Sequence, residues 1–283
     1  MMEEKKFVVD HVTIAWSDLD MLSQVFARVG LETVYGGVHS NNITHMAILG
    51  FDDGSYIELI STLVKGQNSP WWSKQILLNG GPCAWAVRVE DIQREAESVR
   101  KMGIAVEGPN YYNRRSPDGT LVEWDLAFLG EGEPGEQLPF LIADRTPRSY
   151  RVRPSPSVAG SEMRGLEKVI LGVNHLEATR RIFQLLCGWK EAEEMEVTSI
   201  GARLASFKDH PVILAQPLGI DGWLAERMGK FGENPCGYLI GSRDFNQSLE
   251  RQSLDETEMW FGKRLAWFDQ MLSMGILLGV VEV

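Results

Sequence analysis

Apolar and polar residues near the start of the chain first alternate and then change to a helical spacing. Residues 8–15 are rich in β-branched side chains and alternate, which predicts a strand with Val12 on one face and His11 on the other. Residues 19–29 repeat apolar side chains three and four positions apart, which predicts a helix that Asp18 caps. Shorter strands are expected at 31–35, 44–51 and 55–61. The first unit is therefore predicted to be a strand, a helix and three strands.

This strand-and-helix opening recurs three times, which predicts four repeated units. Strands are expected to begin again near residues 83, 166 and 236. Asp91 and Asp244 lie 153 residues apart, and each is expected to cap the helix of its unit. The positions that match His11 in the other units are occupied by Ala84, Lys168 and Gly237. We therefore predict an α+β protein of four tandem βαβββ units, of which only the first has a histidine on its opening strand.

Short motifs in the first half resemble those of a known family. They are residues 10–12 with 18–20, 37–39, 44–45, 53–59, 115–119 with Trp124, 139–142 and 145–147. This set is similar to the glyoxalase-like domain of the vicinal oxygen chelate superfamily, which includes glyoxalase I and extradiol dioxygenases. The resemblance covers residues 7–150 and implies two glyoxalase-like domains, each with curved mixed sheets around a cleft. We expect the first domain, with the candidate site, at residues 1–150, a second, degenerate domain at 160–283, and a linker containing Pro, Ser and Gly at 146–165.

The same resemblance implies a metal site in the first unit. In this superfamily the ligands come from the first and last strands of a unit, where this chain has His11 and Glu58. These two would be catalytic and would hold one divalent ion such as Fe, Mn, Zn or Ni. A full ligand set is not visible, because the matching positions of the third unit hold Lys168 and Leu214, and the last strand of the second unit offers either Ala143 or Asp144, depending on strand register. The alternative is a metal-free pair in which His11 orients Glu58 and serves as a general acid or base.

Further polar and aromatic residues of the first half are candidates for binding a substrate. His39 and His45 flank a polar loop that is expected at the rim of the pocket, unless they are ordinary loop and strand residues. Arg114 and Arg115 precede a turn and can hold an anionic group, although exposed loop arginines more often bind nothing specific. Glu123 and Trp124 lie on an expected strand, where they can add a carboxylate and an aromatic wall.

Composition and charge limit the partners and the location. The formal net charge is −11, and an acidic chain repels nucleic-acid phosphates, so nucleic acid is not an expected partner. The longest late apolar run, residues 276–281, is far shorter than the roughly 20 residues that span a bilayer, and residues 1–6 have no signal-peptide pattern. Three cysteines without a Cys-x-x-Cys pair fit reduced thiols. We therefore expect a cytoplasmic monomer or homodimer that binds a small molecule and no membrane.

Two functions from different classes fit the pattern. The first is an enzyme that acts on a small oxygen-rich or aromatic metabolite in the first-domain cleft, by metal-assisted lyase, isomerase or dioxygenase chemistry. The second is a non-catalytic protein whose cleft binds or sequesters a small molecule, as antibiotic-binding members of the superfamily do. The incomplete ligand set and the tryptophans near the expected pocket, such as Trp71 and Trp72, favour binding, although such tryptophans are more often simply packed. The sequence names no substrate, because one fold carries many functions.

Overall fold

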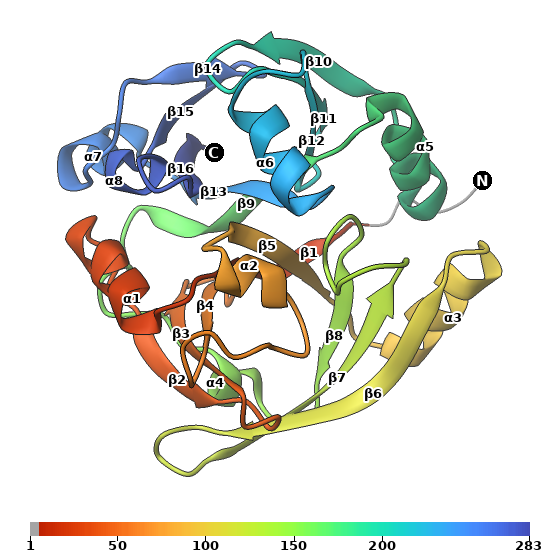
Figure 1. The fold of residues 1–283 in the computed structure, drawn as a ribbon, viewed down its shortest axis with the longest axis vertical. Coiled ribbons are helices and arrows are strands. Elements are labelled where there is room, and N and C mark those ends of the chain that lie inside the picture. The colour runs from red at the N-terminus through yellow and green to blue at the C-terminus, as the bar shows by residue number, and fades with distance from the viewer. Residues whose placement is uncertain (1–5) are drawn as a thin grey trace.

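The computed structural model describes residues 6–283. Residues 1–5, which belong to the segment expected to have no signal-peptide pattern, lie outside the described residues. The chain forms two eight-stranded sheets, one from each half of the sequence (Figure 1). The first half contains β1 (Val8–Ala15), α1 (Leu19–Arg28), β2 (Val34–Val38), β3 (Thr44–Gly50), β4 (Tyr56–Thr62), α2 (Ser73–Leu77), β5 (Gly81–Arg88), α3 (Ile92–Lys101), β6 (Val106–Arg115), β7 (Leu121–Leu129) and β8 (Phe140–Asp144). The second half contains α4 (Arg148–Arg151), β9 (Met163–Gly172), α5 (Leu176–Cys187), β10 (Ala192–Val197), β11 (Ala202–Phe207), β12 (Val212–Pro217), α6 (Trp223–Phe231), β13 (Pro235–Ser242), α7 (Phe245–Arg251), β14 (Glu258–Trp260), β15 (Lys263–Trp267), α8 (Asp269–Leu272) and β16 (Leu277–Glu282).

Each sheet consists of two βαβββ units that meet at their first strands. The strand orders are β2-β3-β4-β1-β5-β8-β7-β6 and β10-β11-β12-β9-β13-β16-β15-β14. Within the first unit β1 pairs in parallel with β4, and the two units join through the antiparallel pair β1 and β5. A bridge between His39 and Arg114 links the two ends of the first sheet, so that this sheet curls almost into a barrel. The predicted α+β fold of four βαβββ units with curved mixed sheets is confirmed.

The helices begin where the sequence places side-chain caps. The carboxylates of Asp18, Asp91 and Asp244 accept backbone N–H groups at the first turns of α1, α3 and α7. The apolar stripe of α1 includes Leu22 and Phe26, which are fully buried. These helices flank the sheets on their outer sides (Figure 1), and each sheet therefore keeps the inside of its curve free for other side chains.

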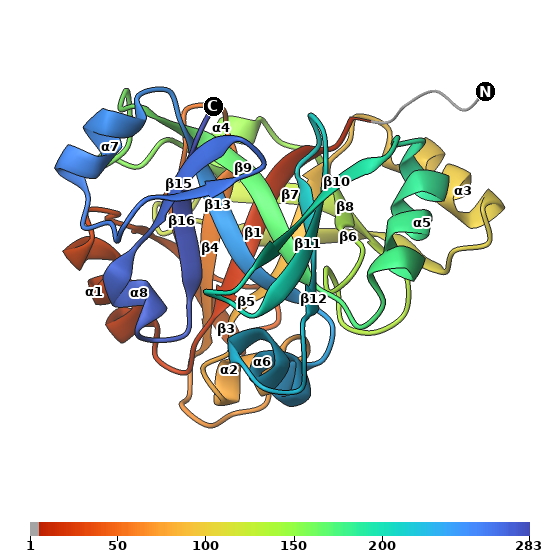
Figure 2. The same ribbon diagram turned by 90° about the horizontal axis from the view of Figure 1, so that it is seen from above.

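The two sheets pack against each other through their central strands. β5 contacts β13 and β1 contacts β9, and these strands overlie one another in Figure 2. Trp85 and Tyr238, one from each sheet, belong to the same buried core, and the Tyr238 hydroxyl donates to the Thr13 and Ala84 carbonyl groups at 3.0 and 2.8 Å. The sheets bracket the expected linker, within which α4 is helical. The domain boundaries themselves stay a prediction.

Within the described residues, 6–283, the structure contains no helix with the length and apolar character that crossing a bilayer requires. The cytoplasmic location and the choice between monomer and homodimer stay predictions.

Candidate functional site

A cavity of about 200 Å³ lies inside the curve of the first sheet. Strands from both halves of the sheet contribute to its wall, together with the loops around residues 39–41 and 69–72. The acidic and basic side chains of the lining, which we call its polar end, are His11, His39, Glu58, Arg114 and Arg151, and both histidines approach Glu58. The remaining wall is largely apolar and aromatic: Met46, Tyr56, Ile60, Trp71, Trp72, Tyr112, Trp124, Leu126, Phe140 and Ile142.

A local irregularity of β1 brings two neighbouring polar side chains together. Adjacent residues of a regular strand point to opposite faces. The pairing of β1 with β5 shifts register between Val9 and His11. Asp10, which lies between them, is therefore the extra residue of a bulge in β1. Such bulges change the direction of a side chain and occur next to functional sites. Here the Asp10 carboxylate reaches the ring of His11, with 2.7 Å between Oδ1 and Nδ1, and both side chains are buried.

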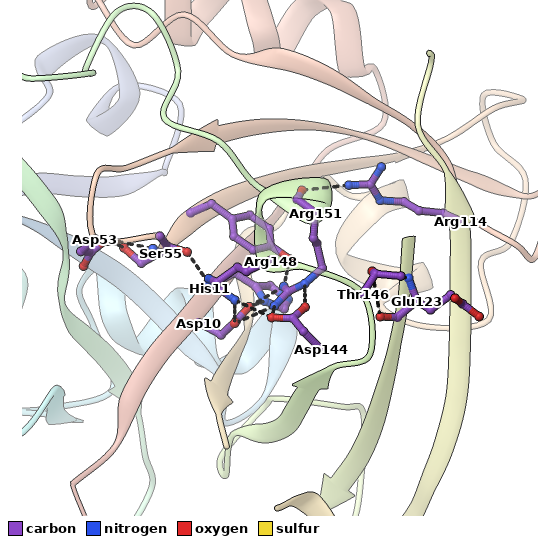
Figure 3. A network of polar contacts seen from close by, with 12 residues as sticks. Asp10, His11, Asp53, Ser55, Arg114, Glu123, Asp144, Thr146, Arg148 and Arg151 are labelled. Atoms are coloured by element: carbon purple, nitrogen blue, oxygen red, sulfur yellow. Dashed lines mark hydrogen bonds and ion pairs between the residues drawn. The ribbon is translucent and has the colours of Figure 1, made fainter. Parts of the chain in front are cut away.

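Two arginines of α4 hold the Asp10 carboxylate in its ionised form (Figure 3). Arg151 donates from Nη1 and Nη2 to the two oxygens at 2.7 and 2.9 Å, and Arg148 donates at 2.6 Å. Asp144 accepts hydrogen bonds from both arginines and so completes the cluster. Burial by itself raises the pKa of Asp10, but Arg151 and then His11 outweigh it and hold this pKa well below its usual value.

The ionised Asp10 sets the tautomer of His11. A carboxylate can only accept hydrogen bonds, so the hydrogen of the contact lies on His11 Nδ1. In the neutral ring, Nε2 then carries a lone pair, and it lies 3.8 Å from Oε2 of Glu58 at the polar end of the cavity. The ring stacks on Tyr56 with 4.6 Å between centroids, which fixes its plane.

Glu58 is ionised as well and lies between two imidazoles. Its Oε1 is 3.4 Å from Nε2 of His39, whose Nδ1 forms a 2.8 Å hydrogen bond with Thr44 Oγ1. Burial raises the pKa of Glu58, but His39, His11 and Arg114 together outweigh burial and lower it. The polar end therefore presents an ionised carboxylate to the cavity, and the Nε2 atoms of two imidazoles lie beside its two oxygens.

The donor set does not form a metal centre. His11 and His39 approach opposite oxygens of Glu58. Among residues 6–283, no group of three or more His, Cys, Asp or Glu side chains is arranged to hold a metal ion. Asp10, the nearest further carboxylate, is committed to Arg148 and Arg151. The described side chains therefore do not assemble the ligand set that the resemblance implies, and the metal-free alternative stays a prediction.

The structure brings four of the predicted site residues together. His11, Glu58, His39 and Trp124 all line the cavity. His11 and Glu58 come from β1 and β4, which pair in parallel, so their side chains meet across neighbouring strands. The tryptophans that the sequence placed near the expected pocket, Trp71 and Trp72, line the cavity too.

Three other predicted residues do not line the cavity, although each stands next to a residue that does. His45 precedes the lining residue Met46 on β3, and Arg115 follows the lining residue Arg114 on β6. Glu123, on β7, accepts a hydrogen bond from an exposed tyrosine at 2.7 Å. In each case the alternation of side chains along a strand turns the predicted residue to the other face.

Sequence reasoning missed Asp10, Tyr56 and the two arginines of α4 as parts of the site. Asp10 stood beside His11, but regular alternation placed it on the opposite face. Arg151 contacts Asp10 across 141 positions of sequence, and its segment was interpreted as a linker. A pair of arginines three residues apart in a Pro-containing segment was the available signal, and it does not identify a partner.

The repeat comparison also needs one correction in the third unit. β9 pairs with β12 so that Ile170 faces Ile213, as Thr13 faces Glu58 in the first unit. The residue that matches Glu58 is therefore Ile213, and the choice of Leu214 was wrong by one position. Leu214 belongs to the core between the sheets. The conclusion is unchanged, since neither side chain can bind a metal.

Comparisons with known proteins agree with this fold. Residues 9–187 match a family model described as a glyoxalase-like domain, whereas a search of curated proteins found no significant match. A hypothetical protein from Staphylococcus aureus has a similar structure, with a TM-score of 0.63, 14% identity, and 97% of this chain and 99% of that chain covered. A mutant of 4-hydroxymandelate synthase from Streptomyces coelicolor has a TM-score of 0.59 at 10% identity, covering 99% of this chain and 93% of that chain. A xylose isomerase-like TIM barrel/4-hydroxyphenylpyruvate dioxygenase fusion protein has a TM-score of 0.57 at 14% identity, covering 99% of this chain and 49% of that one.

These structural likenesses concern the fold alone, because the identities are low. The family match covers more than half of the chain and includes the strands that carry His11 and Glu58. The protein therefore belongs to the glyoxalase-like domain family, within the vicinal oxygen chelate superfamily.

Proposed function

We propose that the cavity of the first sheet binds a small metabolite with a planar apolar part, and that His11 exchanges a proton with it. The observation that carries this proposal is the 2.7 Å contact between His11 Nδ1 and the buried Asp10 carboxylate. This contact makes Nε2 the basic atom at the polar end of the cavity. A histidine oriented by a carboxylate is a common proton-transfer device.

The size and lining of the cavity limit the ligand. A cavity of about 150 Å³ holds one benzene molecule, so the volume of about 200 Å³ suits one ring with a few polar atoms. Trp71, Trp124 and Phe140 offer aromatic walls for such a ring. The lone pairs of His11 Nε2 and the Glu58 carboxylate favour a hydroxyl group or an acidic C–H group at the other end.

The charges around His11 support proton abstraction. When a ligand proton moves to Nε2, the ring becomes a cation between Asp10, 2.7 Å from Nδ1, and Glu58, 3.8 Å from Nε2. Two ionised carboxylates stabilise this cation. Arg114 lines the same cavity, and its positive charge favours the negative charge left on the ligand. Return of the proton to a different atom or face of the ligand gives an isomerase-type reaction, and loss of a leaving group gives a lyase-type reaction.

The test begins with a ligand and then separates binding from proton transfer. Full-length protein is screened by thermal shift against small phenols, aromatic hydroxy acids and hydroxy ketones. The panel includes 4-hydroxymandelate and 4-hydroxyphenylpyruvate, because these names occur among the similar structures. For each compound that binds, proton NMR in D₂O follows the exchange of its acidic C–H group.

The variant His11→Gln is expected to slow this exchange by about 10²-fold or more, the usual contribution of a general base. Ligand affinity, measured by tryptophan fluorescence, should change by less than about tenfold, because the aromatic wall remains. Glu123→Gln is the matched control, since Glu123 lies outside the cavity lining, and it should change neither quantity. Exchange that is as fast in His11→Gln as in the native protein would contradict the proposal.

A binding protein without turnover is the second candidate, and the aromatic lining favours it. Tyr56, Trp71, Trp72, Tyr112, Trp124 and Phe140 all line the cavity. Such a surface supports tight binding of a planar compound without any reaction. This function predicts bound ligands that show no exchange in the native protein, and a His11→Gln variant that only binds them more weakly.

A further inference from the structure

A second cavity, of about 210 Å³, lies in the second sheet at the place that corresponds to the first one. The parallel pair β9 and β12 repeats the register of β1 and β4. Lys168 on β9 occupies the repeat position of His11, and it lines this cavity. The proposed function does not use this cavity or any of its side chains.

The second cavity combines an apolar floor with one amine. Buried side chains from five strands line it: Ile213, Leu239, Trp260, Leu265 and Val281. Lys168 is half-buried, and its Nζ donates a hydrogen bond to the backbone carbonyl of His210 at 2.5 Å. One hydrogen bond of the amine thus anchors it at the cavity wall.

The charges around Lys168 are balanced. Two further lysines and three carboxylates line the cavity: Lys208, Lys263, Glu167, Glu193 and Asp209. The count of three positive and three negative groups includes Lys168 itself, and with its amine unprotonated the carboxylates are in excess. An anionic ligand therefore gains no net attraction, and an uncharged one is favoured. Burial lowers the pKa of Lys168; Glu167 and Asp209 oppose this and Lys263 adds to it, so that the pKa is lowered overall. Desolvation next to another cation is how nucleophilic lysines are activated.

We propose that Lys168 and its apolar cavity form a second site that captures a small uncharged aldehyde or ketone as an imine. The lone pair of the unprotonated Nζ attacks the carbonyl carbon and forms a C–N bond. The carbonyl oxygen takes up the two hydrogens lost by the amine and leaves as water, so that a C=N bond remains. The apolar body of the ligand lies against Ile213, Leu239 and Leu265. This site is independent of the His11 cavity.

The experiment traps the imine on the full-length protein. Isobutyraldehyde, an uncharged probe, is added with sodium cyanoborohydride, whose hydride converts the imine into a stable secondary amine. Peptide mapping by mass spectrometry then follows alkylation at each lysine between pH 6 and 9. Lys208 and Lys263 are the internal controls, because both line the same cavity and are exposed.

We expect Lys168 to be alkylated faster than both controls although it is less exposed, and to remain reactive at lower pH than they do. A bulky aldehyde, 1-pyrenecarboxaldehyde, should alkylate Lys208 but not Lys168. The variant Ile213→Phe, which fills the cavity, should slow alkylation of Lys168 alone. The proposal is overturned if Lys168 reacts no faster than Lys208, or if neither the larger aldehyde nor the filled cavity affects it selectively. The aldehyde comparison uses native protein and decides the question even where Ile213→Phe folds poorly.

Discussion

Replacing Arg151 by methionine tests the charge cluster on which the candidate site depends. Arg151 donates to both oxygens of Asp10 at 2.7 and 2.9 Å and to Asp144 at 2.6 Å, and its side chain is only 3% exposed. Methionine keeps most of the apolar stem but leaves the buried Asp10 carboxylate with Arg148 as its remaining arginine partner. Breaking a buried ion pair in this way costs about 3–5 kcal/mol, so we expect a loss of about this size at neutral pH.

The loss should depend on pH in a defined direction. The pKa of Asp10 in the folded protein is held well below its usual value. Stability from such a group is present above the unfolded pKa, which is about 3.9 for aspartate, and is lost as the pH falls through the folded pKa. The difference in unfolding free energy between the native protein and Arg151→Met should therefore be largest at neutral pH and should narrow below about pH 4.

Urea denaturation between pH 7 and pH 3 measures both quantities. The denaturation midpoint should fall while the slope stays constant, since the surface exposed on unfolding is the same. Arg153→Met is the matched control, because Arg153 is exposed and lies two residues further along, and it should change stability by less than about 0.5 kcal/mol. Equal effects of the two substitutions at pH 7, or a loss in Arg151→Met that does not narrow in acid, would refute the reasoning.

Three further predictions concern the ligand and the metal. Protein purified without chelator is expected to contain no stoichiometric divalent ion by mass spectrometry of metals; an equimolar ion that is lost in Glu58→Gln would contradict this expectation. Trp124→Leu removes an aromatic wall and should weaken binding of an aromatic ligand by up to about tenfold in calorimetry, whereas an unchanged Kd would exclude this wall from the ligand site. Arg115→Ala and His45→Ala should leave that Kd unchanged, because neither residue lines the cavity; a clear loss in either would show that the ligand extends beyond it.

The sequence predicts the fold correctly where a local feature, such as a helix-capping aspartate, recurs at the matching position of the repeated units. Asp18, Asp91 and Asp244 cap their helices as predicted. Other elements lacked such a signal. β10 carries three glutamates in six residues at the edge of its sheet, a composition untypical of strands, and it was not predicted. β6 runs from residue 106 to 115, and its length is not evident from the sequence because its polar residues show no regular alternation.

The site was accessible only in part, for a physical reason. Comparing the four units singled out His11, because the fold accepts alanine, lysine or glycine at its position. The role of Asp10 depends on a bulge that local pattern does not reveal. The role of Arg151 depends on its contact with Asp10, which lies 141 residues away in the sequence. Residues such as Arg115 and Glu123 were chosen one position away from the lining residues, since the register of a strand decides which face each side chain occupies.

We expect the Asp10 carboxylate to hold the hydrogen of His11 on Nδ1 and to leave Nε2 as the basic atom of the cavity. Nitrogen-15 NMR of protein labelled at histidine measures this directly, with His11→Gln supplying the assignment. In the neutral ring we predict a hydrogen on Nδ1 and an unprotonated Nε2, and a change of this pattern in Asp10→Asn. A His11 ring with its hydrogen on Nε2 in the native protein, or a pattern that Asp10→Asn leaves unchanged, would contradict the account.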